Sequence, residues 1–498
     1  MPILSGYHFC KGRAVSAFTA SLGLGALLGL ACAAPASAAP ATADGARKLT
    51  EALQAYVGIE PFAKGFLAIA PHGESYDLAI SFDSSKLDMP ESEGLTRLDR
   101  YVVHLTPKPD GTWAVNTDPG PIALSWTEAG SDQNQKFDLK FADCVSKGVF
   151  DPKLMAFPTL SSKCASAALK VRAPDGDLDL TSGELTSQGT AKAGATGGVD
   201  LTSDVKLAIM NGKFLDKKSP GEPLPITFRI GALHQAMAAT GVRTIAAADL
   251  ITFVRDNAAR NRFELPQDEL KTKLRAALPL WEDLASDASL DDGVVELPTG
   301  SARIAHFEEK QALTGVVKDA RYADSLSYSG LEIPPAVVPD WARVLVPSQA
   351  GYDTKLSFSG LDGMADALIR GLDLTQDPPV SKMAGVALLT RFFSGQPRYD
   401  LSLNATAQAY KVKGQGQASI NPEPQAHIAV SATGFDAVVD ALKKSGDPDM
   451  QNGLMGLAFI KGLAKTGPDG QMIWNVSYDM VTNKVWVNDQ GFALPEPQ

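Results

Sequence analysis

The sequence predicts an α+β protein dominated by long, curved antiparallel β-sheets, with short helices packed on one face and two or three lobes. Segments in which apolar and polar residues alternate recur along most of the chain, separated by turn residues. Helical spacing of apolar residues is confined to a few short segments. About 460 residues follow the N-terminal 38 residues. A chain of this length is usually too long to fold around a single hydrophobic core, so we expect two or three lobes.

The first 38 residues have the pattern of a cleavable export signal. Lys11 and Arg13 provide a positive start, residues 17–34 carry no charge, and Ala36-Ser37-Ala38 offers the small side chains that signal peptidase requires. We therefore expect cleavage after Ala38 and a periplasmic protein. Two alternatives stay open: a membrane anchor, and a lipoprotein that is acylated at Cys32.

A β-rich N-terminal lobe is expected over residues 39–225, after a short helix at Leu49–Tyr56. In Ser75–Phe82 every second side chain is large and apolar, as in a strand with one buried face. The same pattern predicts strands at Tyr101–Leu105, Thr112–Asn116, Ile122–Trp126, Lys136–Phe141, Leu169–Arg172, Asp177–Leu180 and Val205–Ile209. We expect an antiparallel meander with one face in water.

The middle region, residues 226–345, combines helices and strands. Apolar residues at helical spacing predict one helix over residues 250–258. A second helix is expected to begin at Pro266 and to reach Trp281, with a kink or a restart at Pro279. Alternation returns after Pro298, and the Pro-rich segment 334–347 predicts a rigid crossing into the next lobe.

The C-terminal lobe, residues 346–498, contains a weak repeat of strand, tight turn and short helix. Ser359-Gly360-Leu361-Asp362 corresponds to Thr433-Gly434-Phe435-Asp436, each before an amphipathic segment. Glycine allows the turn, and the acid favours the start of a helix. Repetition predicts a sheet that grows by strand–helix units, while a chance match stays an alternative.

The cysteines point to one disulfide bond. Cys10 and Cys32 lie in the leader, so Cys144 and Cys164 remain after cleavage. Two cysteines in an exported chain favour a bond between them, and two free buried thiols are the alternative. They are too few to hold a metal ion, and no histidine is near them in the sequence.

The chain is acidic. Removing the two positive charges of Lys11 and Arg13 with the leader takes the formal net charge from −11 to −13. Such a surface repels phosphates, so nucleic acid is not expected as a partner. The 44% of hydrophobic residues allows a large core and does not exclude an apolar groove.

The sequence shows no pattern for catalysis, cofactor binding or metal binding. His72, His104, His234, His306 and His427 are scattered without ligand spacing. A serine nucleophile elbow and a phosphate-binding loop are both missing from the sequence. We therefore expect no catalytic, cofactor or metal residues and a protein that is not an enzyme. Paired carboxylates for glycan hydrolysis stay open, because they need closeness in space only.

Several features resemble a family of uncharacterised bacterial envelope proteins, the domain of unknown function 2125. They are the exported N-terminus, Pro339-Asp340-Trp341, Ser359–Asp362, and Gly467–Gly470 before a last hairpin. The resemblance covers most of the mature chain. The ending is also similar to other large envelope proteins with long curved sheets, some of which handle lipids. Because the family has no established active site, the resemblance implies no catalytic residue.

Two segments are apolar on nearly every side, Met383–Phe393 and Leu454–Leu463. They are either buried helices or the walls of an apolar pocket, and for Leu454–Leu463 a lip that touches a membrane stays open as well. The second interpretation predicts a ligand wall of Leu454, Met455, Leu457, Phe459, Ile460, Leu388 and Phe392. The leading hypothesis is a non-enzymatic periplasmic envelope protein that binds an apolar ligand such as lipid. The alternatives are a structural protein that docks on an envelope protein complex, and a hydrolase of envelope glycans or lipids.

Overall fold

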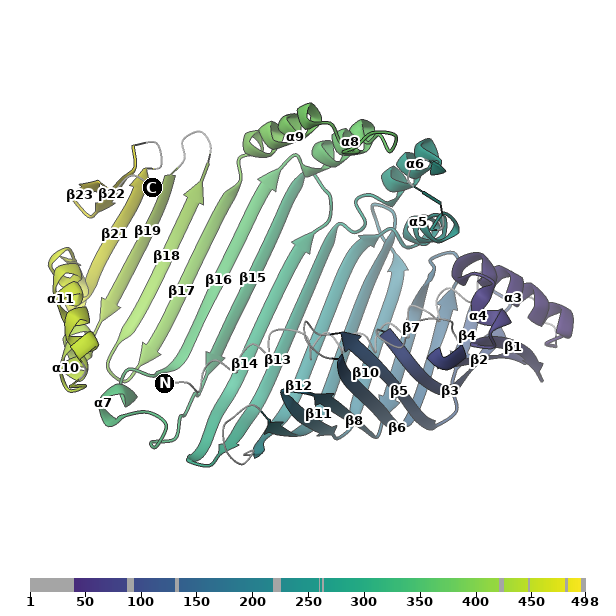
Figure 1. Cartoon of the computed structure of the whole chain (residues 1–498), viewed down its shortest axis with the longest axis horizontal. Helices are drawn as coiled ribbons and strands as arrows, with labels where there is room; N and C mark the ends of the chain where they lie inside the picture. Colours follow the sequence, from purple (N-terminus) through teal and green to yellow (C-terminus); the bar gives the residue numbers. More distant parts are fainter. Residues whose placement is uncertain are drawn as a thin grey trace.

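The computed structural model describes residues 40–498, except for 87–93, 130–133, 218–224, 259, 262–263, 421–424, 447, 480–481 and 494–498. The predicted leader therefore lies outside the described residues. In the described part, 23 strands belong to one sheet. Figure 1 shows a long, twisted sheet whose N-terminal strands come toward the viewer, with helices along its edges. The predicted dominance of antiparallel β-structure is confirmed.

The strands follow one another as an up-and-down meander in which every pair is antiparallel. Their bounds are β1 Leu67–His72, β2 Ser75–Asp83, β3 Gly94–Pro107, β4 Trp113–Asn116, β5 Gly120–Ala129, β6 Asn134–Asp151, β7 Ala156–Cys164, β8 Ser166–Ala173, β9 Gly176–Ser182, β10 Leu185–Ala193, β11 Val199–Asp216 and β12 Pro225–Val242. The later strands are β13 Asp283–Leu297, β14 Gly300–Thr314, β15 Asp319–Ser329, β16 Pro347–Ser359, β17 Arg398–Ala407, β18 Lys411–Ser419, β19 Gln425–Thr433, β20 Lys465–Thr466, β21 Met472–Asp479, β22 Lys484–Val487 and β23 Gln490–Ala493.

Some of these strands are the two halves of one bent strand. β7 and β8 both pair with β6, and β9 and β10 both pair with β11. β7 and β8 pair with β6 in the same register, and so do β9 and β10 with β11. The pairing of each long strand therefore continues through the bend. Pairing also continues across residues 225 and 345, where lobe boundaries were expected. The division into lobes stays a prediction.

A line of bends crosses the long strands near their middles. Asp143 in β6, Ile209 in β11 and Asp292 in β13 have positive φ angles of 48°, 40° and 53°. A residue with a positive φ angle turns the strand. The alternation of inward and outward side chains therefore shifts by one residue at that point. In β6 the buried side chains are Phe141 before the bend and Cys144 after it. Both halves of the strand thus face one apolar interior.

The buried core lies at the N-terminal end of the sheet. Leu49 and Leu53 of helix α3 (Ala43–Val57) cover β2 to β4, where they join a cluster that includes Leu78, Leu105 and Trp113. A second cluster surrounds the disulfide bond between Cys144 and Cys164. Each fully buried Leu side chain contributes about 1.5–3 kcal/mol through apolar surface removed from water. This end of the sheet is therefore closed.

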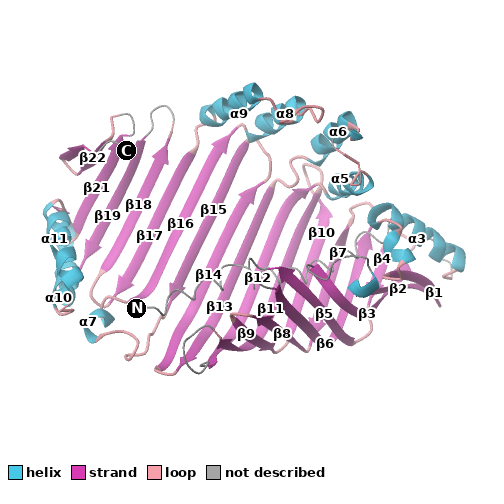
Figure 2. Cartoon of the chain, viewed as in Figure 1, coloured by secondary structure: helices cyan, strands magenta, loops and turns pink. Residues whose placement is uncertain are grey.

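The remaining helices lie mainly at the ends of strands (Figure 2). They are α4 Glu60–Ala63, α5 Thr244–Asp256, α6 Gln267–Ala277, α7 Asp340–Arg343, α8 Leu361–Gly371, α9 Lys382–Ser394, α10 Phe435–Lys443 and α11 Pro448–Gly462. Successive contacts link α3, α5, α6, α8 and α9 along one rim. Each helix from α5 onward is inserted between two strands of the meander, so it emerges at a sheet edge. Helices packed over one face, as expected from the sequence, are limited to α3 and its surroundings.

Two local predictions can be compared directly with the structure. Gly360 and Gly434 both have positive φ angles, 87° and 78°, and both precede a helix, as the repeat predicts. The helix after Pro266 is shorter than expected: α6 ends at Ala277, before Pro279, whose ring cannot continue a helix. Among the described helices, none combines the length and apolar character that crossing a membrane requires.

Candidate functional site

The two faces of the open half of the sheet differ in chemistry. Successive residues of a strand point to opposite faces, and directly paired residues share a face. In β16, Tyr352 and Leu356 therefore lie on one face, and Asp353 and Lys355 on the other. We call these the apolar face and the polar face, and the pairing register extends both across the neighbouring strands.

One row of the apolar face continues directly from the buried core. Cys164 lies opposite Leu185, and from there each partner is again apolar. The row, called here the core-linked row, consists of Leu185, Leu207, Leu233, Leu290, Phe307 and Tyr328. Leu207 is buried, whereas the members from Leu233 to Tyr328 are only partly covered. The interior of the closed end thus opens gradually into a bare sheet face.

A second row on the same face is more exposed. Leu284 lies six positions from Leu290 in β13 and so shares its face. The open row consists of Leu284, Leu313, Tyr322, Leu356 and Tyr399. Its last four members keep between 39% and 41% of their surface in solvent. An apolar row of this length that stays partly exposed is unusual on the surface of a single-chain protein.

A few polar groups lie within the apolar face. The hydroxyl of Tyr352 donates to Oδ2 of Asp324 at 2.9 Å, and Gln311 donates to Glu309 at 2.7 Å. The hydrogen bond to Asp324, followed by burial, raises the pKa of Tyr352 above its ordinary value. Burial, with smaller contributions from Asp324 and Glu309, raises the pKa of Tyr322. These groups could bind the polar end of an otherwise apolar molecule.

The polar face carries a groove of about 1440 Å³ that crosses the strands from β10 to β21. Each strand contributes three consecutive residues, of which the outer two share the polar face. The groove therefore runs between two rows of side chains, and the central backbone forms its floor. One row includes Asp204, Ala236, Asp287, Lys310, Ser325, Asp353 and Ser402, and the other Thr202, Ala238, Ala285, Ala312, Ala323, Lys355 and Asp400.

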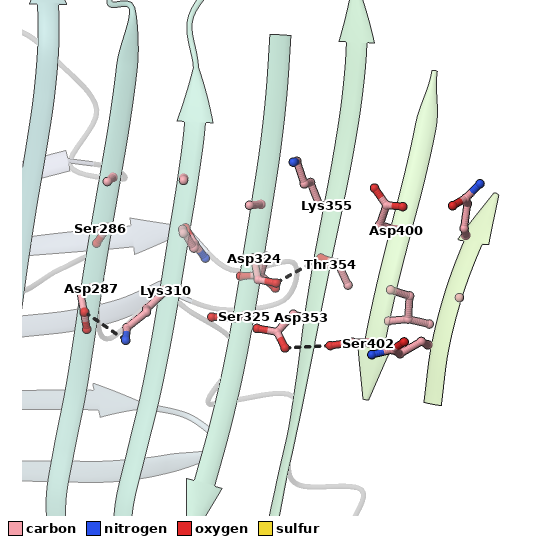
Figure 3. A pocket seen from close by; sticks show the side chains of 18 of the residues that line it. Ser286, Asp287, Lys310, Asp324, Ser325, Asp353, Thr354, Lys355, Asp400 and Ser402 are labelled. Atoms are coloured by element: carbon pink, nitrogen blue, oxygen red, sulfur yellow. Dashed lines mark hydrogen bonds and ion pairs between the residues drawn. The ribbon is translucent and has the colours of Figure 1, made fainter. Parts of the chain in front are cut away.

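Several side chains of the groove form hydrogen bonds or ion pairs with one another. Figure 3 shows Lys310 beside Asp287, 3.7 Å apart, and Ser402 donating to Asp353 at 2.9 Å. At the β11 side His234 contacts Asp204 at 2.6 Å and holds the pKa of that carboxyl below its usual value. Ser402 bonds to a carboxylate and not to a histidine, so it is not set up as a nucleophile.

The structure confirms one predicted pair and places the predicted ligand wall. Cys144 and Cys164 are bonded. Leu388 and Phe392 belong to α9, and Leu454, Met455, Leu457, Phe459 and Ile460 belong to α11. Within the described chain, none of these seven lines the groove of the polar face. Their contact with a ligand stays a prediction.

The two helices are only partly packed against the sheet. Phe392 stacks on Phe358 of β16 with ring centroids 4.9 Å apart, and Trp474 of β21 donates to the carbonyl of Ile460 at 2.7 Å. Met455 and Phe459 keep 71% and 60% of their surface in solvent. α11 is therefore not the fully buried helix that was one of the two interpretations.

The apolar rows were missed at the sequence level, although the alternation at Tyr352–Phe358 is visible. A row across strands depends on the register, which the sequence alone does not reveal.

No family model, no curated protein and no solved structure matches this chain. The resemblance to the domain of unknown function 2125 stays a prediction.

Proposed function

We propose that this protein is an exported, non-enzymatic envelope protein that holds an apolar ligand, such as the acyl chain of a lipid, on the apolar face of its sheet. The observation that carries the proposal is the continuity of the core-linked row with the buried disulfide cluster. An exposed row of apolar side chains is stabilised when an apolar molecule covers it, because apolar surface is then removed from water. Export is supported by the disulfide bond, which forms in oxidising compartments.

The dimensions of the face suit a chain-like ligand. The core-linked row crosses six strands, which at about 4.8 Å per step gives roughly 24 Å. Covering apolar groups along this line contributes about 0.8 kcal/mol for each CH₂ removed from water. The hydroxyl of Tyr352 and the carboxylate of Asp324 would lie beside such a chain and could bind a polar headgroup.

A docking protein for another envelope protein is the second candidate. It is favoured by α9, on which Met383, Val386 and Leu389 keep 82%, 63% and 59% of their surface in solvent. A partner of this kind would cover the rim helix and leave the sheet face unoccupied.

A pair of double variants distinguishes the two candidates. Leu313→Gln with Leu356→Gln changes the open row, and Ala312→Gln with Lys355→Gln changes the adjacent positions on the polar face. We expect the first variant to weaken binding of a fluorescent acyl probe with an uncharged headgroup at least tenfold and the second to leave it unchanged. Circular dichroism checks that both fold. Equal effects of the two variants, or no binding by the wild type, would favour the docking protein.

A further inference from the structure

Pairing of the first three strands brings three possible metal ligands together. Asp77 of β2 lies directly opposite His104 of β3, and Ala70 of β1 lies opposite Asp77 on its other side. His72 is two positions beyond Ala70 and therefore shares this face. The neighbours of these residues, such as Leu78 and Leu105, point into the core instead. The core packs against the opposite face of these strands. The backbone positions from which the three side chains extend are therefore held in place.

The three side chains converge at short distances. Nδ1 of His104 is 2.7 Å from Oδ1 of Asp77, and Nδ1 of His72 is 3.3 Å from the same oxygen. One donor atom from each residue lies within 4.8 Å of the other two. Tetrahedral ligands around a zinc ion are about 3.3 Å apart, since each bond is about 2.0–2.1 Å. Small side-chain adjustments would therefore suffice to close around a metal ion.

A fourth residue holds the imidazole in position. Oδ2 of Asp118 accepts from Nε2 of His104 at 3.1 Å. A carboxylate on the far nitrogen of a ligating histidine is the usual outer support of a metal site, because it fixes the proton there and leaves the near nitrogen free to ligate. Nδ1 is the nitrogen that faces Asp77 and His72. It is hydrogen-bonded to Oδ1 of Asp77 at 2.7 Å, so a metal ion that binds here would replace the proton on Nδ1.

The donor set selects the class of ion. Two imidazole nitrogens and one carboxylate oxygen suit Zn²⁺, Cu²⁺ or Ni²⁺, whereas Ca²⁺ and Mg²⁺ prefer oxygen ligands alone. The side chain of His72 is 68% exposed, so water can reach a further coordination position. We propose that His72, Asp77 and His104 form a zinc-class divalent metal site, with Asp118 as its positioning residue.

The test is calorimetric titration of the full mature protein with Zn²⁺, after cleavage of any histidine tag and treatment with chelator. We expect one ion per chain for the wild type, and loss of binding for His104→Ala and for Asp77→Asn. Asp118→Asn should weaken binding roughly 10- to 100-fold, as outer-shell changes do. Ca²⁺ and Mg²⁺ should not bind at this site.

The chain offers two matched controls. His234 contacts Asp204 at 2.6 Å, and His306 contacts Asp291 at 2.6 Å. Among the described residues, neither pair belongs to a group of three possible metal ligands. His234→Ala and His306→Ala should bind Zn²⁺ like the wild type. Absence of stoichiometric Zn²⁺ binding by the folded wild type would overturn the proposal, and so would equal losses in the control variants.

Discussion

Cys164 of β7 lies directly opposite Leu185 of β10, so the disulfide-bonded core and the apolar face belong to one row of side chains. The row begins in a closed interior and continues across strands that nothing in the described chain fully covers. One end of the sheet therefore packs into a buried core. At the other end, the apolar face has no second layer of described residues packed over it.

The disulfide should stabilise the closed end. It joins residues 20 positions apart, and closing such a loop contributes about 3 kcal/mol in the chain-entropy model. We expect Cys144→Ser with Cys164→Ser to lower the free energy of unfolding by roughly this amount in a urea titration. Reducing agent should destabilise the wild type and leave the double variant unchanged. An unaltered urea midpoint in the double variant would contradict the prediction.

Helix α3 should be essential to the core through its buried face. Leu53→Ala removes a side chain that is 2% exposed within the first cluster. Truncation of a buried leucine leaves a cavity and costs about 2–5 kcal/mol. Lys48→Ala, on the exposed side of the same helix, is the control and should leave the urea midpoint unchanged. Similar midpoints for the two variants would show that α3 does not pack as described.

The bend at Ile209 should carry backbone strain. Its φ of 40° is unfavourable for a β-branched residue, and its side chain is 43% exposed. Ile209→Gly should therefore raise the free energy of unfolding, by about 1 kcal/mol. Ala208→Gly, one position earlier in the same strand, should instead lower it, because glycine loses more backbone freedom there. Destabilisation by both changes would argue against strain at this bend.

The pair formed by Tyr352 and Asp324 should be visible in an alkaline titration. The hydrogen bond to Asp324, together with burial, raises the pKa of Tyr352 above 10.0, its ordinary value. A raised pKa in the folded state stabilises the protein below pH 10. That contribution is lost as the pH rises through the folded-state pKa. The difference in absorbance between the wild type and Tyr352→Phe during the titration reports the ionisation of Tyr352 alone.

Asp324→Asn should shift the same transition to lower pH, because the phenolate no longer forms beside a carboxylate. Asp353→Asn, a neighbouring change on the polar face, is the control and should not move it. A transition that is independent of Asp324 would contradict the assigned hydrogen bond.

The sequence predicted the closed end well. Alternation in Ser75–Phe82 and the helix at Leu49–Tyr56 correspond to β2 and α3, since each element places buried apolar residues on one face. Cys144 and Cys164 were paired correctly because no other cysteine follows the leader.

Prediction was weaker wherever a strand bends or lacks large side chains. The strand expected at Lys136–Phe141 is the first half of β6, which continues to Asp151. Alternation changes phase at Asp143, so the pattern in the sequence ends there. β12, β13 and β18 were missed because Ala, Gly, Ser and Asp dilute their apolar positions. β1, β7 and β17 were not predicted either.

The candidate sites depend on pairing that no local pattern records. The two rows of the apolar face together require the register of eight strands, from β10 to β17, and Asp77 and His104 are 27 positions apart in the sequence. Spacing rules for metal ligands apply within one helix or loop, so they could not indicate His72, Asp77 and His104.

The most direct test of the account is the content of the protein as it is isolated. The mature chain would be purified from an envelope extract without detergent, and its organic extract analysed by mass spectrometry. We predict an apolar molecule with an acyl chain at close to one per protein chain, and its loss from the variant with Leu313→Gln and Leu356→Gln. A folded wild-type protein that yields no such molecule would contradict the claim that the apolar face holds a ligand.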